Sequence, residues 1–212
     1  MALVVKPFLV KIEFIKFIKF LRRALKSMAK DYATLPYNQV RRQDREVTDE
    51  TWIYEKLHKT PFGSFSTVYN GQPFINTNIF AYDEEKHVIY LHTAHQGRTR
   101  ANAELNQRVC FSISEMGRFL PAKTAKAMSV EYCGVVIFGT VTIIEDELEA
   151  RHALDLLLKK YFPHLTVGKD YQEITCPELE QTTVYRIDIE QWSGKKKQEA
   201  ADFPGAFFYP KC

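Results

Sequence analysis

The segment 130–144, VEYCGVVIFGTVTII, constrains the fold more than any other part of the chain. Its many β-branched residues favour an extended strand over a helix, because branching at Cβ restricts the side-chain rotamers that a helical turn allows. Gly134 and Gly139 interrupt the apolar run, and glycines inside a strand are typical of bulges or of barrel corners. The segment therefore predicts one long, bent strand of a small antiparallel barrel.

The rest of the chain supplies partners for this strand. Asn70 and Gly71 form the dipeptide that most strongly predicts a two-residue β-hairpin, and Thr48 is placed to cap a short helix. The helices that we expect cover 48–58, 98–107 and 145–161, the last with apolar residues at helical spacing. The other expected strands are 64–69, 74–82, 87–93, 108–114 and 183–190. Six antiparallel strands with flanking helices predict an α+β fold around a barrel.

The first thirty residues differ in charge from the remainder. They contain eight Lys or Arg and one Glu, a net charge of +7, whereas the remainder holds 21 of the 29 basic and 25 of the 26 acidic residues, a net charge of −4. Within them, 13–30 predicts an amphipathic helix with basic residues along one face. Basic residues at every third or fourth position exclude a membrane span, which needs about 20 consecutive apolar residues, and a secretory signal.

Three interpretations of this amphipathic segment stay open. It could lie as a peripheral helix on an anionic membrane surface, it could be a targeting presequence, or it could be upstream sequence ahead of a start at Met28. We expect a basic N-terminal extension at 1–30, a linker at 31–47 and a barrel domain at 48–212.

The body lacks the motifs of several large functional classes. It has no βαβ alternation, no GxGxxG motif and no Walker loop, so Rossmann and P-loop chemistry are not expected. Its slightly acidic balance argues against a nucleic-acid partner. The four cysteines are scattered without a CxxC pair, which is typical of buried thiols in a reducing compartment and predicts a cytoplasmic protein without a metal site. We find no nucleophile and base with an orienting third group, so hydrolase chemistry is unsupported.

The stretch 90–104, YLHTAHQGRTRANAE, contains the densest set of functional residue types. A metal site is disfavoured, because His92 and His95 lack a third ligand at suitable spacing. Two interpretations remain. The stretch could be a solvated strand end before a helix, or a phosphate cradle in which Gly97 allows a sharp turn, the helix start offers free amides and Arg98 offers a guanidinium.

Six segments along the chain occur in an order that resembles a known family. Together they resemble the pyridoxamine 5′-phosphate oxidase-like FMN-binding split barrels, and within them the branch of 5-nitroimidazole-resistance (Nim-type) and related flavin-nucleotide-binding proteins. The resemblance covers about residues 38–198. The segments are VRRQDREVTD (40–49), GQPFINTNIFAYD (71–83), IYLHTAHQGRTRANAE (89–104), NQRVCFSI (106–113), YCGVVIFGTV (132–141) and QWSGKKK (191–197).

This resemblance implies a six-stranded antiparallel split β-barrel that forms a homodimer with FMN at the subunit interface. The residues that it implies for the FMN phosphate are Gly97, Arg98 and Thr99. Thr99 stands where the family has a lysine, and Arg100 is placed to replace the lost charge. The residues implied along the isoalloxazine edge are Asn76, Thr77, Asn78, His92, Thr93 and Ala94. Trp192 is expected either to pack near the ring from the partner subunit or to be a core tryptophan.

The same resemblance implies a function. We expect an FMN-dependent oxidoreductase that passes electrons to a small acceptor such as a nitroaromatic compound, with NADH or NADPH as candidate donors. His92 is the candidate catalytic residue, facing the substrate, and a purely structural role is its alternative. The alternative for the whole chain is a non-catalytic flavin- or haem-binding protein with a storage or sensing role, because a fold does not determine a function.

Overall fold

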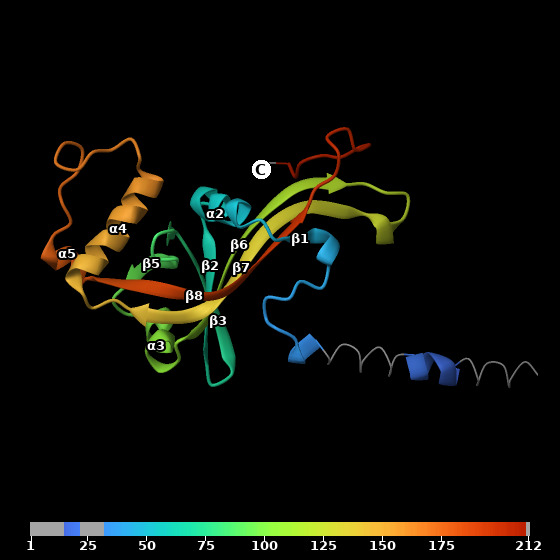
Figure 1. The fold of residues 1–212 in the computed structure, drawn as a ribbon, viewed down its shortest axis with the longest axis horizontal. Helices are drawn as coiled ribbons and strands as arrows, with labels where there is room; N and C mark the ends of the chain where they lie inside the picture. The colour runs from blue at the N-terminus through green and yellow to red at the C-terminus, as the bar shows by residue number, and fades with distance from the viewer. Residues whose placement is uncertain (1–14, 22–31, 211–212) are drawn as a thin grey trace, which may run out of the picture. The chain divides into compact units, whose positions relative to one another are not determined.

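The computed structural model describes residues 15–21 and 32–210, which fall into two compact units, Met1–Gln39 and Val40–Cys212 (Figure 1). In the first unit, residues 15–21 are helical. The rest of the predicted amphipathic helix, at 13–14 and 22–30, lies outside the described residues. The second unit holds the sheet and the candidate site. Among the helices in the described part of the chain, none has the length and hydropathy of a membrane span.

The second unit is built on one antiparallel sheet of eight strands, which confirms the α+β fold class. Its order is β3-β2-β6-β7-β8-β5-β4, and β1 pairs with β8 outside this path. The path has β3 and β4 at its two ends, so the barrel is not closed. The strands are β1 Glu46–Val47, β2 Gly63–Tyr69, β3 Gln72–Asn78, β4 Ala81–Asp83, β5 Val88–Ala94, β6 Arg108–Leu120, β7 Ser129–Ile143 and β8 Thr182–Lys197.

The helices of this unit are short apart from one. Asp49, rather than the predicted Thr48, caps the first of them, because its carboxylate accepts a hydrogen bond from the Thr51 amide at 3.0 Å. Figure 1 shows α3 (Arg98–Leu105) beside the β2–β3 hairpin. It shows α4 (Glu147–Tyr161), the longest of these helices, at the opposite end of the sheet from the C-terminal tail. The helices are α2 Glu50–Lys59, α3 Arg98–Leu105, α4 Glu147–Tyr161 and α5 Cys176–Glu180, with 3-10 turns η1 Tyr32–Thr34, η2 Gln43–Arg45 and η3 Ala125–Ala127.

Two differences raise the strand count from the predicted six to eight. The predicted strand 74–82 divides at Ile79 and Phe80, because the chain leaves the β2 edge after β3 and joins β5 through β4. The two-residue strand β1 was not predicted, since it is too short to carry a pattern. The predicted hairpin is confirmed, with β2 and β3 paired across Asn70 and Gly71.

The long strand predicted over 130–144 is confirmed as β7. The register between β7 and β8 shifts between Phe138 and Gly139, which is the bulge that the glycine predicts. A Cβ at Gly139 would overlap the carbonyl oxygen of Asp188, so the close approach of the two backbones requires glycine there. The bend carries β7 and β8 from the core to the region of the C-terminal tail, where Phe207 pairs with Phe119.

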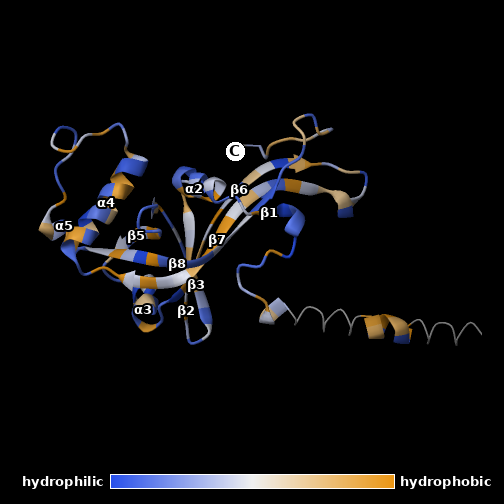
Figure 2. Cartoon of the chain, in the orientation of Figure 1, coloured by the Kyte–Doolittle hydropathy of each residue, from blue (hydrophilic) through white to orange (hydrophobic). Residues whose placement is uncertain are grey.

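Two apolar clusters lie on opposite faces of β5. One fills the barrel interior and includes Ile89, Leu91 and Tyr185. The other lies beneath α4 and includes Tyr90 and Val184. Successive residues of a strand point to opposite faces, and in Figure 2 hydrophobic and hydrophilic residues accordingly interchange along the strands. This alternation decides which side chains of the candidate site can meet.

Candidate functional site

The turn between β5 and α3 has the geometry that the phosphate interpretation requires. Gly97 is the residue before the first helical residue of α3, Arg98, and it adopts φ 150° and ψ 171°. This φ lies in the region that glycine reaches readily and other residues do not. Nothing lies within 4 Å of the position that a Cβ would take at Gly97. The first amides of a helix have no partner within the helix, so those at the start of α3 are available to a ligand.

Arg98 and Arg100, both in the first turn of α3, are in different states. Arg98 is exposed and makes no hydrogen bond or ion pair with the rest of the described chain. The guanidinium of Arg100 is bonded to its own chain: it donates to Glu104 Oε1 at 2.8 Å, to His95 Nδ1 at 2.9 Å and to Thr183 Oγ1 at 3.0 Å. No acidic residue lies in this first turn. Arg98 is therefore the cation that is free to bind an anion.

Side-chain amides hold the β3 edge against the turn. Asn76 donates to the Thr99 hydroxyl at 3.3 Å, and Thr99 is almost fully buried. Asn78 donates to the backbone carbonyl of His92 and accepts from the Ile79 amide at 2.8 Å. Because these bonds connect β3 to β5 and to α3, the structure brings three separate predicted segments into one site.

His92 and Thr93 point to opposite faces of β5. Thr93 faces the barrel interior, where its hydroxyl lies 2.9 Å from the hydroxyl of Tyr185. His92 lies opposite Val184 in the register, on the face that carries α4. Its Nδ1 is buried without a hydrogen-bond partner among the described residues, and burial lowers the pKa of its imidazole. At neutral pH His92 is therefore an uncharged ring with one unused nitrogen.

Three of the other predicted residues lie outside this set of contacts. Thr77 points away from Asn76 and Asn78 along β3, and its hydroxyl lies 3.4 Å from that of Ser64. Ala94 ends β5 and is exposed. Trp192 is ten residues along β8 from the residue that pairs with Ala94, a distance of about 30 Å along an extended strand.

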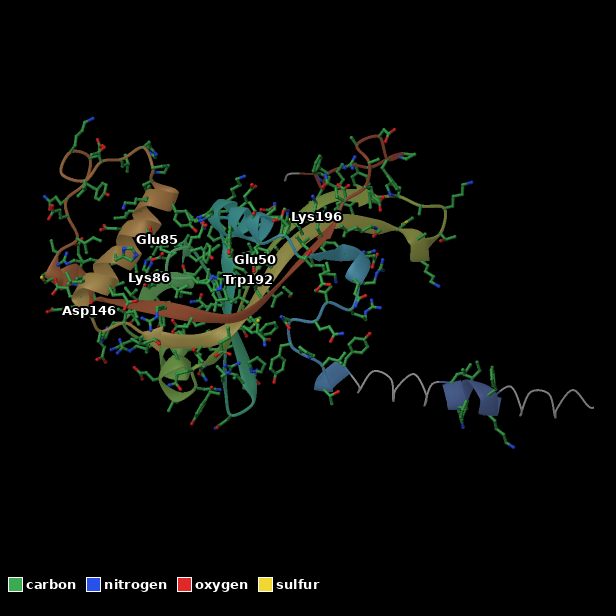
Figure 3. All side chains as sticks on the ribbon, viewed as in Figure 1. Glu50, Glu85, Lys86, Asp146, Trp192 and Lys196 are labelled. Atoms are coloured by element: carbon green, nitrogen blue, oxygen red, sulfur yellow. The ribbon has the colours of Figure 1, made fainter. Side chains whose placement is uncertain are left out.

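Trp192 packs within its own chain. Figure 3 labels Trp192 on β8. Its ring centroid lies 4.6 Å from that of His87 and 5.6 Å from that of Tyr54. These contacts describe a half-buried core tryptophan, and a place near a flavin would require a site formed with a second copy.

Two residues of the site, Thr183 and Tyr185, were not predicted. They lie on β8, which is hydrogen-bonded to β5 with Thr93 opposite Thr183. Both lie inside the predicted strand 183–190, and their spacing of two residues places them on the same face of it. The pairing of two strands about 90 residues apart has no local signal, so the sequence could not place them beside the turn.

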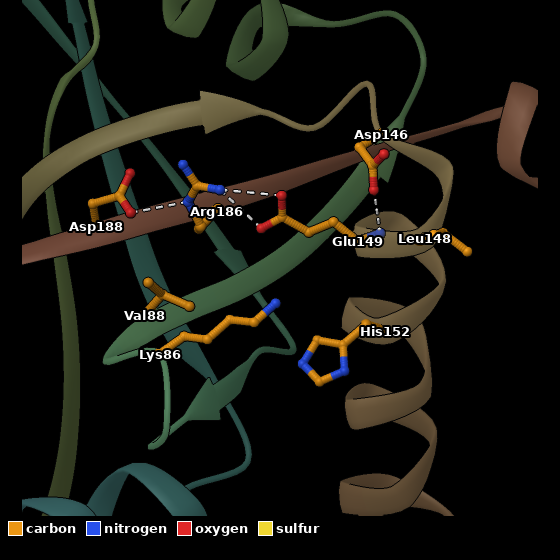
Figure 4. Close-up of a pocket in the computed structure, with 8 residues that line it drawn as sticks. All are labelled: Lys86, Val88, Asp146, Leu148, Glu149, His152, Arg186 and Asp188. Carbon is orange, nitrogen blue, oxygen red and sulfur yellow. Dashed lines mark hydrogen bonds and ion pairs between the residues drawn. The ribbon is translucent and has the colours of Figure 1, made fainter.

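A pocket with a volume of about 670 Å³ lies elsewhere, between α4, β5 and β8 (Figure 4). It is strongly charged, but its charges are satisfied within the chain. Arg186 bonds Glu149 at 2.9 Å and Asp188 at 2.9 Å, and His152 bonds the buried Asp83 at 2.7 Å. Tyr90 donates to Glu149 at 2.8 Å. Size alone therefore does not mark this pocket as the functional site.

The open antiparallel sheet with flanking helices is an α+β split barrel. The glycine turn between β5 and α3 is its candidate phosphate site. A family model described as pyridoxamine 5′-phosphate oxidase matches residues 49–196. The chain therefore belongs to the pyridoxamine 5′-phosphate oxidase family, as the resemblance predicted. Comparison with curated proteins gives no significant match.

Solved structures share the fold. The flavocytochrome Anf3 of Azotobacter vinelandii is 21% identical, with a TM-score of 0.69 over 84% of this chain and 87% of that one. An FAD and heme binding protein of Mycobacterium smegmatis is 19% identical, with a TM-score of 0.65 over 73% and 74%. A candidate 5-nitroimidazole antibiotic resistance protein of Bacteroides thetaiotaomicron VPI-5482 is 22% identical, with a TM-score of 0.59 over 71% and 86%. At these identities the likeness establishes the fold.

Proposed function

We propose that this protein is an FMN-dependent oxidoreductase that holds the cofactor phosphate at the Gly97 turn. The observation that carries the proposal is the unpaired Arg98 guanidinium beside an open helix start. A phosphate monoester is the ligand that suits this arrangement, because helix-start amides and a guanidinium both donate charge-assisted hydrogen bonds to it. The family and its similar structures, among them flavin- and haem-binding proteins, support a flavin at such a turn.

The residues present fit such a cofactor in two respects. First, the departure from the family lysine does not remove the cation, since Arg98 remains available while Arg100 is held by Thr183 and Glu104. Second, Thr99 is used internally, because its buried hydroxyl accepts from Asn76. We infer that Arg98 is the sole side-chain cation of the cradle and that Thr99 contributes only its backbone amide.

FMN would supply the redox chemistry, accepting electrons from a donor such as NADH or NADPH and passing them to a small acceptor, of which a nitroaromatic compound is our candidate. The protein positions the ring and excludes water. Asn76 ties the β3 edge to α3 and Asn78 ties it to β5, and the Thr93 hydroxyl lies against the hydroxyl of the buried Tyr185. His92 remains our candidate catalytic side chain, although it lies on the α4 face of β5, because its Nδ1 is buried without a partner among the described residues.

We also propose that the working form is a homodimer. The strand β3 is a sheet edge with exposed apolar residues, Phe74 at 37% and Ile75 at 62%, and such an edge favours pairing or covering. Nothing in the described chain lies within 4 Å of a Cβ position at Gly97, which leaves room for a second copy to approach the turn. Trp192 reaches a cofactor at this turn only from another copy, because its own turn is about 30 Å away along β8.

The test is the absorbance of the purified protein before and after FMN is added, followed by anaerobic addition of NADH or NADPH. We expect flavin absorption bands that bleach with one of the two nucleotides. A protein that is colourless and takes up no FMN would contradict the flavin assignment. A Soret band in place of flavin bands would favour the alternative of a haem-binding protein, which two of the similar structures support by their names.

A further inference from the structure

The helix formed by residues 15–21 has an apolar surface that the flavin site does not use. Five of its seven residues are apolar: Ile15, Phe17, Ile18, Phe20 and Leu21. Phe17 is 56% exposed and Phe20 is 68% exposed, and Figure 2 shows this helix as mostly hydrophobic. Exposed aromatic side chains at this density are unusual on a protein that has nothing to bind, because each loses free energy in water.

The two remaining residues of the helix, Lys16 and Lys19, lie together on one side. At 100° per residue they fall within about 60° of each other, opposite Leu21. The sequence around the helix extends this charge, since residues 1–30 carry eight basic residues and one acidic residue. A cationic side beside a wide apolar side complements a surface that is negatively charged outside and apolar beneath.

We propose that residues 15–21 bind the surface of an anionic lipid membrane, with the aromatic side chains inserted among the lipids and Lys16 and Lys19 at the headgroups. A lysine at the edge of an inserted helix lays its aliphatic chain along the apolar region and places its ammonium group at the lipid phosphates. The proposal is independent of the flavin site, because it uses only residues of the first unit.

The experiment is flotation of the full chain with vesicles of phosphatidylcholine alone and of phosphatidylcholine with 30% phosphatidylglycerol, at low and at 1 M salt. We expect binding to the anionic vesicles that weakens at 1 M salt, because the Debye length falls from about 10 Å at 0.1 M to about 3 Å. The double variant Lys16→Gln/Lys19→Gln should bind anionic vesicles roughly 30-fold more weakly, since each basic residue at such a surface contributes about a factor of five.

The double variant Phe17→Ser/Phe20→Ser should lose most of the binding. Its matched control is Phe62→Ser/Phe208→Ser, which removes two phenylalanines of the second unit with similar exposed fractions, 58% and 71%. The control should float like the unaltered chain. Failure of the unaltered chain to float would overturn the proposal, as would equal flotation of all variants. A change of oligomeric mass in Phe17→Ser/Phe20→Ser without lipid would overturn it in favour of a protein partner.

Discussion

The Gly97 turn and the pocket beside α4 contain similar residue types in opposite electrostatic states. Each has an arginine and a histidine. In the pocket, Arg186 is held by two carboxylates and His152 by the buried Asp83. At the turn, Arg98 has no partner among the described residues and His92 keeps a buried nitrogen unused. The charges of the pocket are satisfied, and that of Arg98 at the turn is not satisfied within the described chain.

This difference separates groups that stabilise the fold from groups that await a ligand. Charges that find partners within a chain hold elements together, as Arg186 joins β8 to α4 through Glu149. A buried polar atom without a partner costs free energy that a ligand can recover, and an exposed cation such as Arg98 can exchange its water for an anion. Four substitutions, in order of decreasing expected effect, sharpen or break this distinction.

Arg186→Ala should destabilise the fold by about 2 kcal/mol, below the roughly 3–5 kcal/mol of a fully buried pair, because the Arg186 and Glu149 side chains are 28% and 20% exposed. Glu149 would keep only Tyr90 as a close donor. Urea unfolding measures the change, and FMN affinity should stay the same. Lys59→Ala, which breaks the exposed pair with Glu55, is the control and should cost less than about 1 kcal/mol. Lost FMN affinity in a stable Arg186→Ala protein would break the distinction.

Asn78→Ala should cost about 1–2 kcal/mol, because it removes two part-buried hydrogen bonds, one to the His92 carbonyl and one from the Ile79 amide. Thermal unfolding measures it. Thr77→Ala, the neighbour that points away from the site, should stay within about 0.5 kcal/mol of the unaltered chain. Equal losses in the two variants would show that β3 is not held to β5 by Asn78.

Lys160→Met should alter the pH dependence of stability at alkaline pH. Burial lowers the pKa of Lys160 to about 8 from 10.5, so between these values the unfolded chain binds the proton and the folded chain does not. Stability of the unaltered chain should therefore rise across this window, by about 1 kcal/mol once partial exposure of the ammonium is allowed for. The variant should lack this rise in urea midpoints from pH 7.5 to 10.5. If the urea midpoints of the variant and of the unaltered chain follow the same pH dependence, burial does not lower the pKa of Lys160.

His92→Gln should produce the smallest change in folding stability, and this change should again depend on pH. Burial lowers the pKa of His92, so below about pH 6.5 the unfolded chain takes up a proton that the folded chain resists. Stability of the unaltered chain should fall with acidification over this range, and that of the variant should fall less. Turnover of the loaded protein should change as well if His92 faces the substrate, and unaltered kinetics would leave it a structural residue.

The fold was largely predictable because its signals are local. The β-branched run with Gly139 predicted the bent β7, Asn70 and Gly71 predicted the hairpin, and apolar spacing predicted α4. The cap at Asp49 was missed by one residue, since Thr48 and Asp49 are both good capping residues. The division of 74–82 was missed because it depends on which strand the chain joins next.

The candidate site was predictable where one segment contains it. Gly97 and Arg98 lie in a single turn, and their residue types alone indicate an anion. The partners of Arg100 come from another strand, Thr183 above all, and no sequence pattern revealed that this guanidinium is already bonded. Strand alternation does predict that His92 and Thr93 face opposite sides, although the expected flavin edge grouped them.

The FMN dissociation constant of the unaltered chain and of Arg98→Ala, measured by quenching of flavin fluorescence, tests the central claim most directly. Loss of the one guanidinium at this turn that has no partner among the described residues should weaken binding by about 1.5–3 kcal/mol, roughly 10- to 150-fold, with no change in stability. Arg41→Ala, an exposed arginine remote in sequence from the turn, serves as the control and should bind like the unaltered chain. An unchanged constant in Arg98→Ala would contradict the assignment of the Gly97 turn as the phosphate site.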